Sequence, residues 1–357
     1  MPHEAEQNNR PVRGLRVVAI GGGTGLSTLL KGLKSYTAAA GESPAELPFI
    51  SDLTAVVTVS DDGGSSGRLR RELGMLPPGD VRNCLVALSA DESLISKLFQ
   101  YRFSSSGDLE GHNFGNLFLA ALTALTGDFA VAVKQASEIL ATRGHILPAT
   151  SANVQLEAIM DDGSHVVGET KINGSEKRIV ELMIVPSNPE PLPQALQAIA
   201  DADVITMGPG SLFTSLVPNL LVRGVADAIA NSPAVKVYIC NLMTEANESL
   251  NMRASDHIKA LYAHAAGHKI FDYALVNCAP VSPQMKERYA EEHAEQVECD
   301  TTTIEQLGVQ CIPGNFIEES HFARHATDRL CRELLRLAES ANLPVDVPQQ
   351  AFIHSKH

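Results

Sequence analysis

The sequence contains no tryptophan, and aromatic residues make up only 5% of its 357 residues. It also lacks a long apolar run, since no segment offers the roughly 18 uninterrupted apolar residues that a membrane span requires. The N-terminal MPHEAEQNNRPVRG has no apolar core of the kind found in signal peptides. We therefore expect a cytoplasmic protein without a membrane span.

Basic residues are scarce. The chain has 28 Lys and Arg against 42 Asp and Glu, which leaves a formal net charge of -14. This balance argues against bulk nucleic acid or an anionic membrane as the main partner. An anionic ligand would have to be held by local features, such as helix N-termini, glycine-rich turns and a few arginines.

Paired cysteine motifs are also missing, because the six cysteines are scattered and none stands in a C-x-x-C pair. This pattern predicts reduced thiols, as in a cytosolic protein. The histidine pairs His264/His268 and His321/His325 have no third ligand at motif spacing, so no firm metal site is predicted.

Short β-branched runs alternate with longer helical patterns, which predicts a mainly parallel, doubly wound α/β sheet. The predicted strands are 16–20, 54–59, 204–207, 235–241, 273–277 and 309–312. Helices are expected after Thr24, Asp80, Asn113 and Asp128, and over 192–200, 218–230, 255–265 and 323–338.

The chain is predicted to form a single domain over residues 14–342, between flexible tails at 1–13 and 343–357. Residues 155–185 alternate apolar and polar side chains around Asp162-Gly163 and Asn173-Gly174. These dipeptides favour hairpin turns, so we expect an antiparallel hairpin insertion at the edge of the sheet. Such hairpins often only cover an edge, and we expect this one to carry no chemistry.

A glycine-rich turn follows the first predicted strand, in VVAIGGGTGLSTLLKGLK. Backbone amides in such a turn can approach a phosphate, and the dipole of the following helix favours its negative charge. The turn is not a Walker A loop, and Leu26 stands where the dinucleotide fingerprint has its third glycine. Its predicted ligand-binding residues are Gly21, Gly22, Gly23, Thr24 and Gly25.

The segment TVSDDGGSSGRLRREL follows the second predicted strand, which would lie beside the first turn. An acidic residue there commonly accepts ribose hydroxyls, and Asp61 with Asp62 could instead hold Mg²⁺ against a diphosphate. The following loop is rich in glycine, hydroxyl groups and arginine. Its predicted ligand-binding residues are Gly64, Ser65, Ser66 and Arg68.

Two predicted helix starts carry further polar residues. In PPGDVRNCL, Asp80 is expected to cap a helix, whereas Arg82 opposes the helix dipole and therefore indicates a partner anion. In GHNFGNLF, Asn113 and Asn116 stand at another helix start and are predicted to bind the ligand. His112 beside them is expected to be a structural hydrogen-bonding residue.

A second glycine turn, in VITMGPGSLFTSL, repeats the pattern of the first after another buried strand. Its predicted ligand-binding residues are Gly208, Gly210 and Ser211. Two such turns at the carboxyl ends of strands in one sheet would flank a single crevice. Asn241, after the next strand, is predicted to line the same crevice.

The motifs GGGTG, SDDGGSSGRLR, PPGDVRN, GHNFGN and GPGSLFTS, in this order, resemble those of the YvcK/CofD-like family. The longer matches look like its YvcK branch, the gluconeogenesis factors. The resemblance implies a Rossmann-like three-layer α/β/α fold and a site for a nucleotide sugar such as UDP-N-acetylglucosamine. It also implies a cytoplasmic regulatory role in cell shape and in growth on gluconeogenic carbon sources, without establishing a reaction.

The resemblance extends toward the C-terminus, where Tyr289 and the pair Arg324-His325 match the YvcK branch, and Tyr289 and Arg324 join the predicted ligand-binding residues. The chain departs from the family pattern at residues 245–249, which read EANES in place of QPGET. It departs again at Ala326, where the family has Asp. A homo-oligomer, and cell-wall or morphogenesis proteins as partners, are further expectations.

Two alternatives stay open. The CofD branch is similar to a Mg²⁺-dependent transferase that moves 2-phospholactate from a guanosine diphosphate carrier onto a deazaflavin precursor. In that case Asp62 or Asp80 would orient the acceptor. An NAD-dependent oxidoreductase fits less well, because the fingerprint is imperfect and no hydride-transfer partner is recognisable.

Overall fold

The computed structural model describes residues 14–37, 49–90, 94–104 and 107–341. The two predicted tails, 1–13 and 343–357, lie outside the described residues. Among the described residues, no single helix is long and apolar enough to cross a membrane. The segments Leu212–Leu220 and Val225–Asn231 pass that test only as a pair, bent by 78°.

A seven-stranded parallel sheet runs through the molecule in the order β10-β9-β8-β7-β1-β2-β3. Its strands are β1 (Leu15–Gly21), β2 (Ile50–Val57), β3 (His145–Pro148), β7 (Val204–Met207), β8 (Val235–Ile239), β9 (Tyr273–Asn277) and β10 (Gln310–Gly314). The chain builds outward from β1 through β2 and β3, and then in the opposite direction from β7. The strand order therefore reverses between β1 and β7, which is where doubly wound sheets bind ligands.

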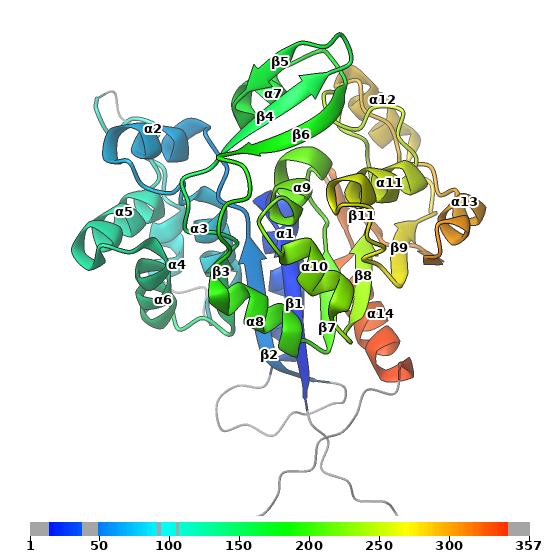
Figure 1. Ribbon diagram of the computed structural model, residues 1–357, viewed down its shortest axis with the longest axis horizontal. Coiled ribbons are helices and arrows are strands. Elements are labelled where there is room, and N and C mark those ends of the chain that lie inside the picture. The colour runs from blue at the N-terminus through cyan, green and yellow to red at the C-terminus, as the bar shows by residue number, and fades with distance from the viewer. Residues whose placement is uncertain (1–13, 38–48, 91–93, 105–106, 342–357) are drawn as a thin grey trace, which may run out of the picture.

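Helices cover both faces of this sheet, as the three-layer expectation requires (Figure 1). On one face α1 (Gly23–Leu33) packs between α3 (Gly79–Leu88) and α14 (Thr327–Ser340), and on the other α8 (Pro193–Asp201) packs against α10 (Val225–Asn231). The face of α1 toward the sheet buries Leu26, Leu29, Leu30 and Leu33. Each leucine contributes about 1.5–3 kcal/mol of burial free energy, which holds the start of α1 at the end of β1.

The remaining helices surround this framework. They are α2 (Gly64–Leu73), α4 (Leu94–Gln100), α5 (Phe114–Thr126), α6 (Phe129–Ile139), α9 (Val217–Leu220), α11 (Ala254–His264), α12 (Pro283–Glu291), α13 (Thr301–Gln306), the 3-10 turn η1 (Lys34–Tyr36) and the π-helical turn η2 (Leu212–Leu216). The predicted helix over 218–230 is in fact divided between α9 and α10, because Gly224 between them takes a left-handed φ of 75°. Strand β3, which no sequence pattern predicted, forms one edge of the sheet.

The predicted insertion forms a separate antiparallel sheet, in the order β5-β4-β6 (Figure 1). It contains β4 (Gln155–Met160), β5 (His165–Val167), the short helix α7 (Glu169–Asn173) and β6 (Ile179–Val185). Asp162-Gly163 connects β4 to β5 as predicted. Asn173-Gly174 instead ends α7, because the Gly174 amide donates to the carbonyl of Thr170 as in a helix.

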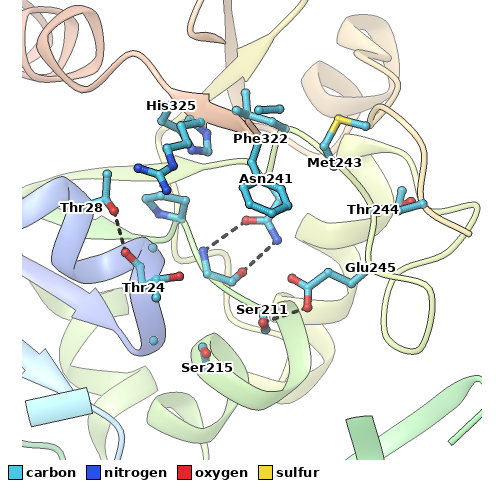
Figure 2. Close-up of a pocket in the computed structure, with 18 of the residues that line it drawn as sticks. Thr24, Thr28, Ser211, Ser215, Asn241, Met243, Thr244, Glu245, Phe322 and His325 are labelled. Carbon is cyan, nitrogen blue, oxygen red and sulfur yellow. Dashed lines mark hydrogen bonds between the residues drawn. The ribbon is translucent and has the colours of Figure 1, made fainter. Parts of the chain in front are cut away.

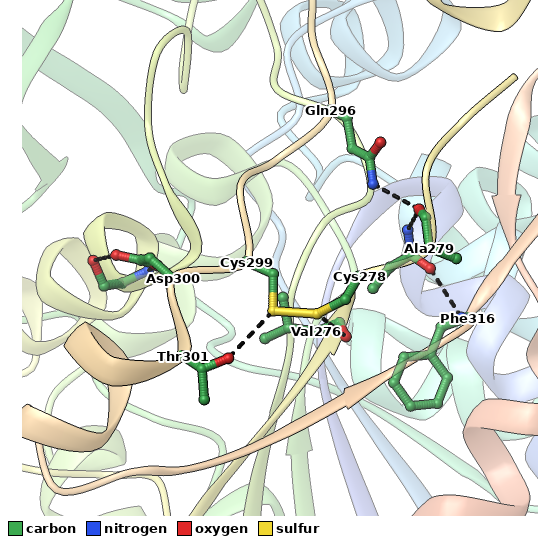
Figure 3. Close-up of a disulfide and its surroundings, with 10 residues drawn as sticks. Val276, Cys278, Ala279, Gln296, Cys299, Asp300, Thr301 and Phe316 are labelled. Atoms are coloured by element: carbon green, nitrogen blue, oxygen red, sulfur yellow. Dashed lines mark hydrogen bonds between the residues drawn. A yellow bond between two sulfur atoms is a disulfide. The ribbon is translucent and has the colours of Figure 1, made fainter. Parts of the chain in front are cut away.

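The expectation that all cysteines are reduced is wrong for one pair, because Cys278 and Cys299 form a disulfide (Figure 3). Cys278 directly follows β9, and Cys299 lies just before α13, 21 residues further along the chain. The fold brings their Cα atoms to 5.7 Å, a separation suited to a disulfide. The other four cysteines are buried free thiols.

Candidate functional site

The first glycine turn leads from β1 directly into α1. The N-cap of α1 is Gly22, with no side-chain cap and no acidic residue in the first turn, so the positive end of the helix dipole is not neutralised within the helix. Asp80 reaches this turn from α3, where its carboxylate accepts a hydrogen bond from the Gly23 amide. The predicted helix cap is therefore wrong, because Pro78 occupies the N-cap of α3 and Asp80 lies in the first helical turn.

The second turn follows β7 and lies against the first. A Cβ at Gly25 would be 2.3 Å from the carbonyl oxygen of Pro209, so only glycine allows the two turns to approach this closely. Asn241 holds the second turn from β8: its Oδ1 accepts from the Gly210 amide at 3.2 Å, and its Nδ2 donates to the Gly210 carbonyl at 2.9 Å (Figure 2). The two glycine turns thus meet at the switch point between β1 and β7.

A pocket of about 990 Å³ lies between these turns and the C-terminal part of the chain. Its size is at the upper end of the range usual for ligand sites. Its wall brings together these predicted residues: Gly22, Gly23, Thr24, Gly25, Gly210, Ser211, Asn241, Tyr289 and Arg324. Ser215 also lines the pocket and was not predicted, although it ends the GPGSLFTS motif.

A short hairpin, β11 (Ile317–Glu319) and β12 (Ala323–His325), forms the C-terminal wall of the pocket. The sequence predicts a helix from Ala323 onward, but residues 323–325 are a strand and α14 begins only at Thr327. Pairing with β11 and the hydrogen bond from the Ala326 amide to the Phe316 carbonyl, at 2.7 Å, override the local helical pattern. The extended backbone brings Arg324 and His325 to the pocket.

His325 is held as a neutral imidazole. Burial lowers its pKa to about 4, and its Nε2 lies 3.1 Å from the carbonyl oxygen of Cys240. Because a carbonyl only accepts, Nε2 carries the proton, and Nδ1 is left as an acceptor. His325 therefore adds no positive charge to the pocket at neutral pH.

The other predicted ligand-binding residues do not line this pocket. They are Gly21, Asp61, Asp62, Gly64, Ser65, Ser66, Arg68, Asn113, Asn116 and Gly208. Residues 63–67, predicted as a loop, form the start of α2. There the Ser65 hydroxyl accepts from the Asn113 amide and lies 3.1 Å from Nδ1 of His112. The Ser66 hydroxyl similarly accepts from Asn116, so this group joins α2 to the start of α5.

Asp61, Asp80 and Glu169 form an acidic cluster near the first turn. Burial raises the pKa of Asp61, and it raises that of Asp80 to about 6 with a contribution from the charge of Asp61. Burial together with these two charges raises the pKa of Glu169, on α7, to about 9. The three carboxyl groups therefore repel one another when ionised.

The insertion reaches the main domain at Asp62, next to this cluster, and the expectation that it carries no chemistry stays a prediction. The amide and hydroxyl of Thr170 donate to Oδ1 of Asp62, at 2.8 and 2.6 Å. Asp61 instead accepts from the Gly63 amide at 2.8 Å, so the two aspartates have different hydrogen-bond partners. Within the described ranges, no three His, Cys, Asp or Glu side chains are grouped so as to hold a metal ion.

Two glutamates of residues 245–249, the EANES segment that differs from the family pattern, bond to the second turn and the residues after it. Glu245 Oε2 accepts from the Ser211 hydroxyl at 2.9 Å (Figure 2), and burial raises its pKa. Glu248, only 4% exposed, accepts from the Phe213 amide at 2.8 Å and from the Thr214 hydroxyl at 2.5 Å. Burial and the charge of Glu245 raise the pKa of Glu248 to about 7. Their role could not be predicted, because no local pattern links residues 34 positions apart.

Known proteins share this architecture. Residues 17–317 match the family described as 2-phospho-L-lactate transferase CofD. The gluconeogenesis factor of Bacillus subtilis is 44% identical over 323 residues, covering 90% of this chain and 98% of its own length. The gluconeogenesis factor of Halalkalibacterium halodurans is 46% identical over 320 residues, covering 89% of this chain and 95% of its own length.

The fold is also similar to that of a solved structure. A crystal structure of a UPF0052 family protein from Bacillus halodurans superposes with a TM-score of 0.84 at 46% identity, covering 90% of this chain and 99% of that one. The two glycine turns at the switch point, the order of the motifs and these similarities agree. The chain belongs to the CofD family and, within it, to the branch of the gluconeogenesis factors.

Proposed function

We propose that this protein is a cytoplasmic regulatory protein that binds a nucleotide sugar, such as UDP-N-acetylglucosamine, between its two glycine turns. The observation that carries the proposal is the meeting of these turns at the switch point, where Gly25 lies against Pro209. Helix N-termini and exposed backbone amides are the groups that bind a diphosphate without a large positive charge. They suit a chain whose net charge is -14.

In this proposal, different pocket residues bind different parts of the nucleotide sugar. The first-turn amides of α1 and the Ser211 hydroxyl face the diphosphate, and Arg324 adds a positive charge. Tyr289, half-buried in the wall, offers an aromatic face to the base or sugar. Asn241 acts as a positioning residue, because both of its polar atoms are used by Gly210.

The proposed biological role is supported by the two relatives described above, both of which are named gluconeogenesis factors. We infer that ligand binding sets the activity of this protein in growth on gluconeogenic carbon sources and in cell shape. A homo-oligomer that contacts cell-wall or morphogenesis proteins would transmit the ligand signal.

Calorimetry with UDP-N-acetylglucosamine tests the binding site. We expect micromolar binding to the full chain and a loss of at least about tenfold in affinity, about 1.4 kcal/mol, for Tyr289→Ala and for Arg324→Ala. Tyr101→Ala and Arg332→Ala are matched controls, because both residues are exposed and outside the pocket. The absence of both heat and a thermal shift with any UDP-sugar would refute the proposal.

A Mg²⁺-dependent transferase of the phospholactate type is the second candidate. The mutual repulsion of Asp61, Asp80 and Glu169 favours it, because a divalent cation would relieve that repulsion. These carboxylates have the oxygen ligands that Mg²⁺ prefers, but the three are not grouped so as to hold the ion alone, so a substrate diphosphate would have to supply further ligands. The test is product formation from a phospholactyl guanosine diphosphate and a deazaflavin precursor with Mg²⁺. No turnover by the wild type would exclude this reading.

A further inference from the structure

A second cavity, of about 1000 Å³, adjoins the pocket between the glycine turns. It lies between α1, α3, α4 and β12, on the other side of Arg324. Thr28, Gln100 and Arg324 line both cavities, so the two are continuous. The two glycine turns do not reach this cavity, so its ligand must be recognised by side chains.

The side chains of this second cavity are strongly basic. Lys31, Arg82, Lys97 and Arg324 come from four different elements and converge on it. Within the part of the chain that the structure describes, none of these four forms an ion pair with a carboxylate. Such a concentration is unusual in a protein with a net charge of -14.

The acidic residue in the cavity wall does not neutralise this charge. Asp328 already forms an i,i+4 ion pair with Arg332 at 2.5 Å, and it also accepts from the Tyr36 hydroxyl at 3.2 Å. Among the described residues, Asp328 therefore forms no ion pair with Lys31, Arg82, Lys97 or Arg324.

Arg82 gives the clearest sign that an anion belongs here. Burial lowers the pKa of its guanidinium and the charge of Arg102 lowers it further, while the charges of Asp80 and Asp61 act in the opposite direction. Its Nε donates to Asn116 Oδ1 at 3.2 Å, which is a neutral partner. Its place near the N-terminus of α3 is also unfavourable, because the helix dipole is positive there. Arg82 is half-buried and its Nε bonds to a neutral amide, so an anion bound in the cavity would give its guanidinium a charge-assisted hydrogen bond.

We propose that this cavity binds a second, small polyanionic ligand of the diphosphate or bisphosphate class, beside the ligand of the glycine turns. The cations of α1, α3 and α4 would hold its phosphate groups. A long polyanion such as nucleic acid is disfavoured by the overall negative charge of the chain. Because Arg324 lines both cavities, the two ligands would lie on either side of one guanidinium. The inference does not depend on the nucleotide-sugar proposal.

Calorimetry of the full chain with inorganic pyrophosphate at low salt tests this inference. We expect the double variant Lys31→Gln/Lys97→Gln to bind pyrophosphate at least about tenfold more weakly than the wild type, since two exposed cations are removed. Lys134→Gln/Lys286→Gln is the matched control, because both lysines are exposed and lie outside the cavity. Their substitution removes the same net charge. This control should bind pyrophosphate within twofold of the wild type.

Competition separates a second site from the first. Pyrophosphate should still bind when the protein is saturated with UDP-N-acetylglucosamine, and the lysine double variant should leave affinity for that nucleotide sugar within twofold. Equal pyrophosphate affinity of the cavity variant and the wild type would overturn the inference. So would an equal loss in the control variant, or full displacement of pyrophosphate by the nucleotide sugar. If no nucleotide sugar binds, the comparison of the two lysine variants still decides the question.

Discussion

The carboxyl group of Asp80 lies half-buried beside the first glycine turn, where burial and the charge of Asp61 raise its pKa from 3.8 to about 6. Because the native pKa is higher than the unfolded one, Asp80 supports stability at pH below about 4. This contribution is lost as the pH rises through 6. The difference of about 2 pKa units corresponds to roughly 3 kcal/mol.

We therefore expect Asp80→Asn to stabilise the protein at pH 8, by up to about 3 kcal/mol, and to have little effect at pH 4. Asparagine keeps an acceptor for the Gly23 amide but cannot ionise. Denaturant unfolding at the two pH values measures the effect. Asp108→Asn, at an exposed position, serves as the control. A loss of stability at pH 8 would contradict the argument.

The role of a residue could be predicted from the sequence where it depends on neighbouring residues, and not where it depends on a distant partner. The glycines of both turns were identified because a strand followed by glycine and a helix is readable from adjacent residues. The partners of Asp80 and of Asp62 were not, because Gly23 and Thr170 lie far from them in the sequence. Arg82 was singled out from its helix position alone, and its anionic partner stays a prediction; in the structure its Nε donates to Asn116.

At the scale of elements, the start of α1 depends on the absence of a side chain at Gly25. We expect Gly25→Ala to destabilise the fold by about 1–3 kcal/mol, because the new Cβ would lie 2.3 Å from the backbone of Pro209. It should also weaken any ligand of the glycine turns. Thermal unfolding measures the first effect, with Gly174→Ala, where the nearest atom is 3.3 Å away, as control. Equal melting temperatures for both variants would contradict this packing.

The disulfide connects the end of β9 to the segment before α13. A cross-link that closes a loop of this length stabilises a protein by about 3 kcal/mol. We expect a reductant to lower the melting temperature of the wild type and to leave that of Cys278→Ser unchanged. Mass spectrometry after alkylation without reductant should find four reactive thiols in the unfolded wild type. Six alkylated thiols there would show that the bond is absent.

Elements were predicted where their residues alternate in a regular way and missed where tertiary pairing decides. Strands β7 and β9 have the predicted limits, because buried parallel strands are short apolar runs. Strand β12 was mistaken for the start of a helix, since its pairing with β11 is not visible in the local pattern. The same difference moved Arg324 from a helix surface to the pocket wall.

At the scale of the whole molecule, the insertion is joined to the main domain beside the acidic cluster. We expect Thr170→Val to remove the hydroxyl hydrogen bond to Asp62, to leave the bond from the Thr170 amide in place, and to lower stability by about 0.5–1.5 kcal/mol. Hydrogen exchange should then become faster in α7 and stay unchanged in β1. Ser164→Ala, which loses only hydrogen bonds within the insertion, is the control. Unchanged exchange in α7 would show that the insertion is held by other contacts.

The sequence by itself determined the fold class, the single main sheet and both glycine turns, because hydrophobic spacing and glycine chemistry are local properties. Only the tertiary structure decided that the turns touch at Gly25 and Pro209 and that Thr170 bonds to Asp62. It also decided that Cys278 pairs with Cys299 and that Lys31, Arg82 and Lys97 meet beside Arg324. Asp62 and Thr170, for example, are 108 positions apart in the sequence. Such contacts arise only when the sheet has assembled and side-chain directions are set by packing.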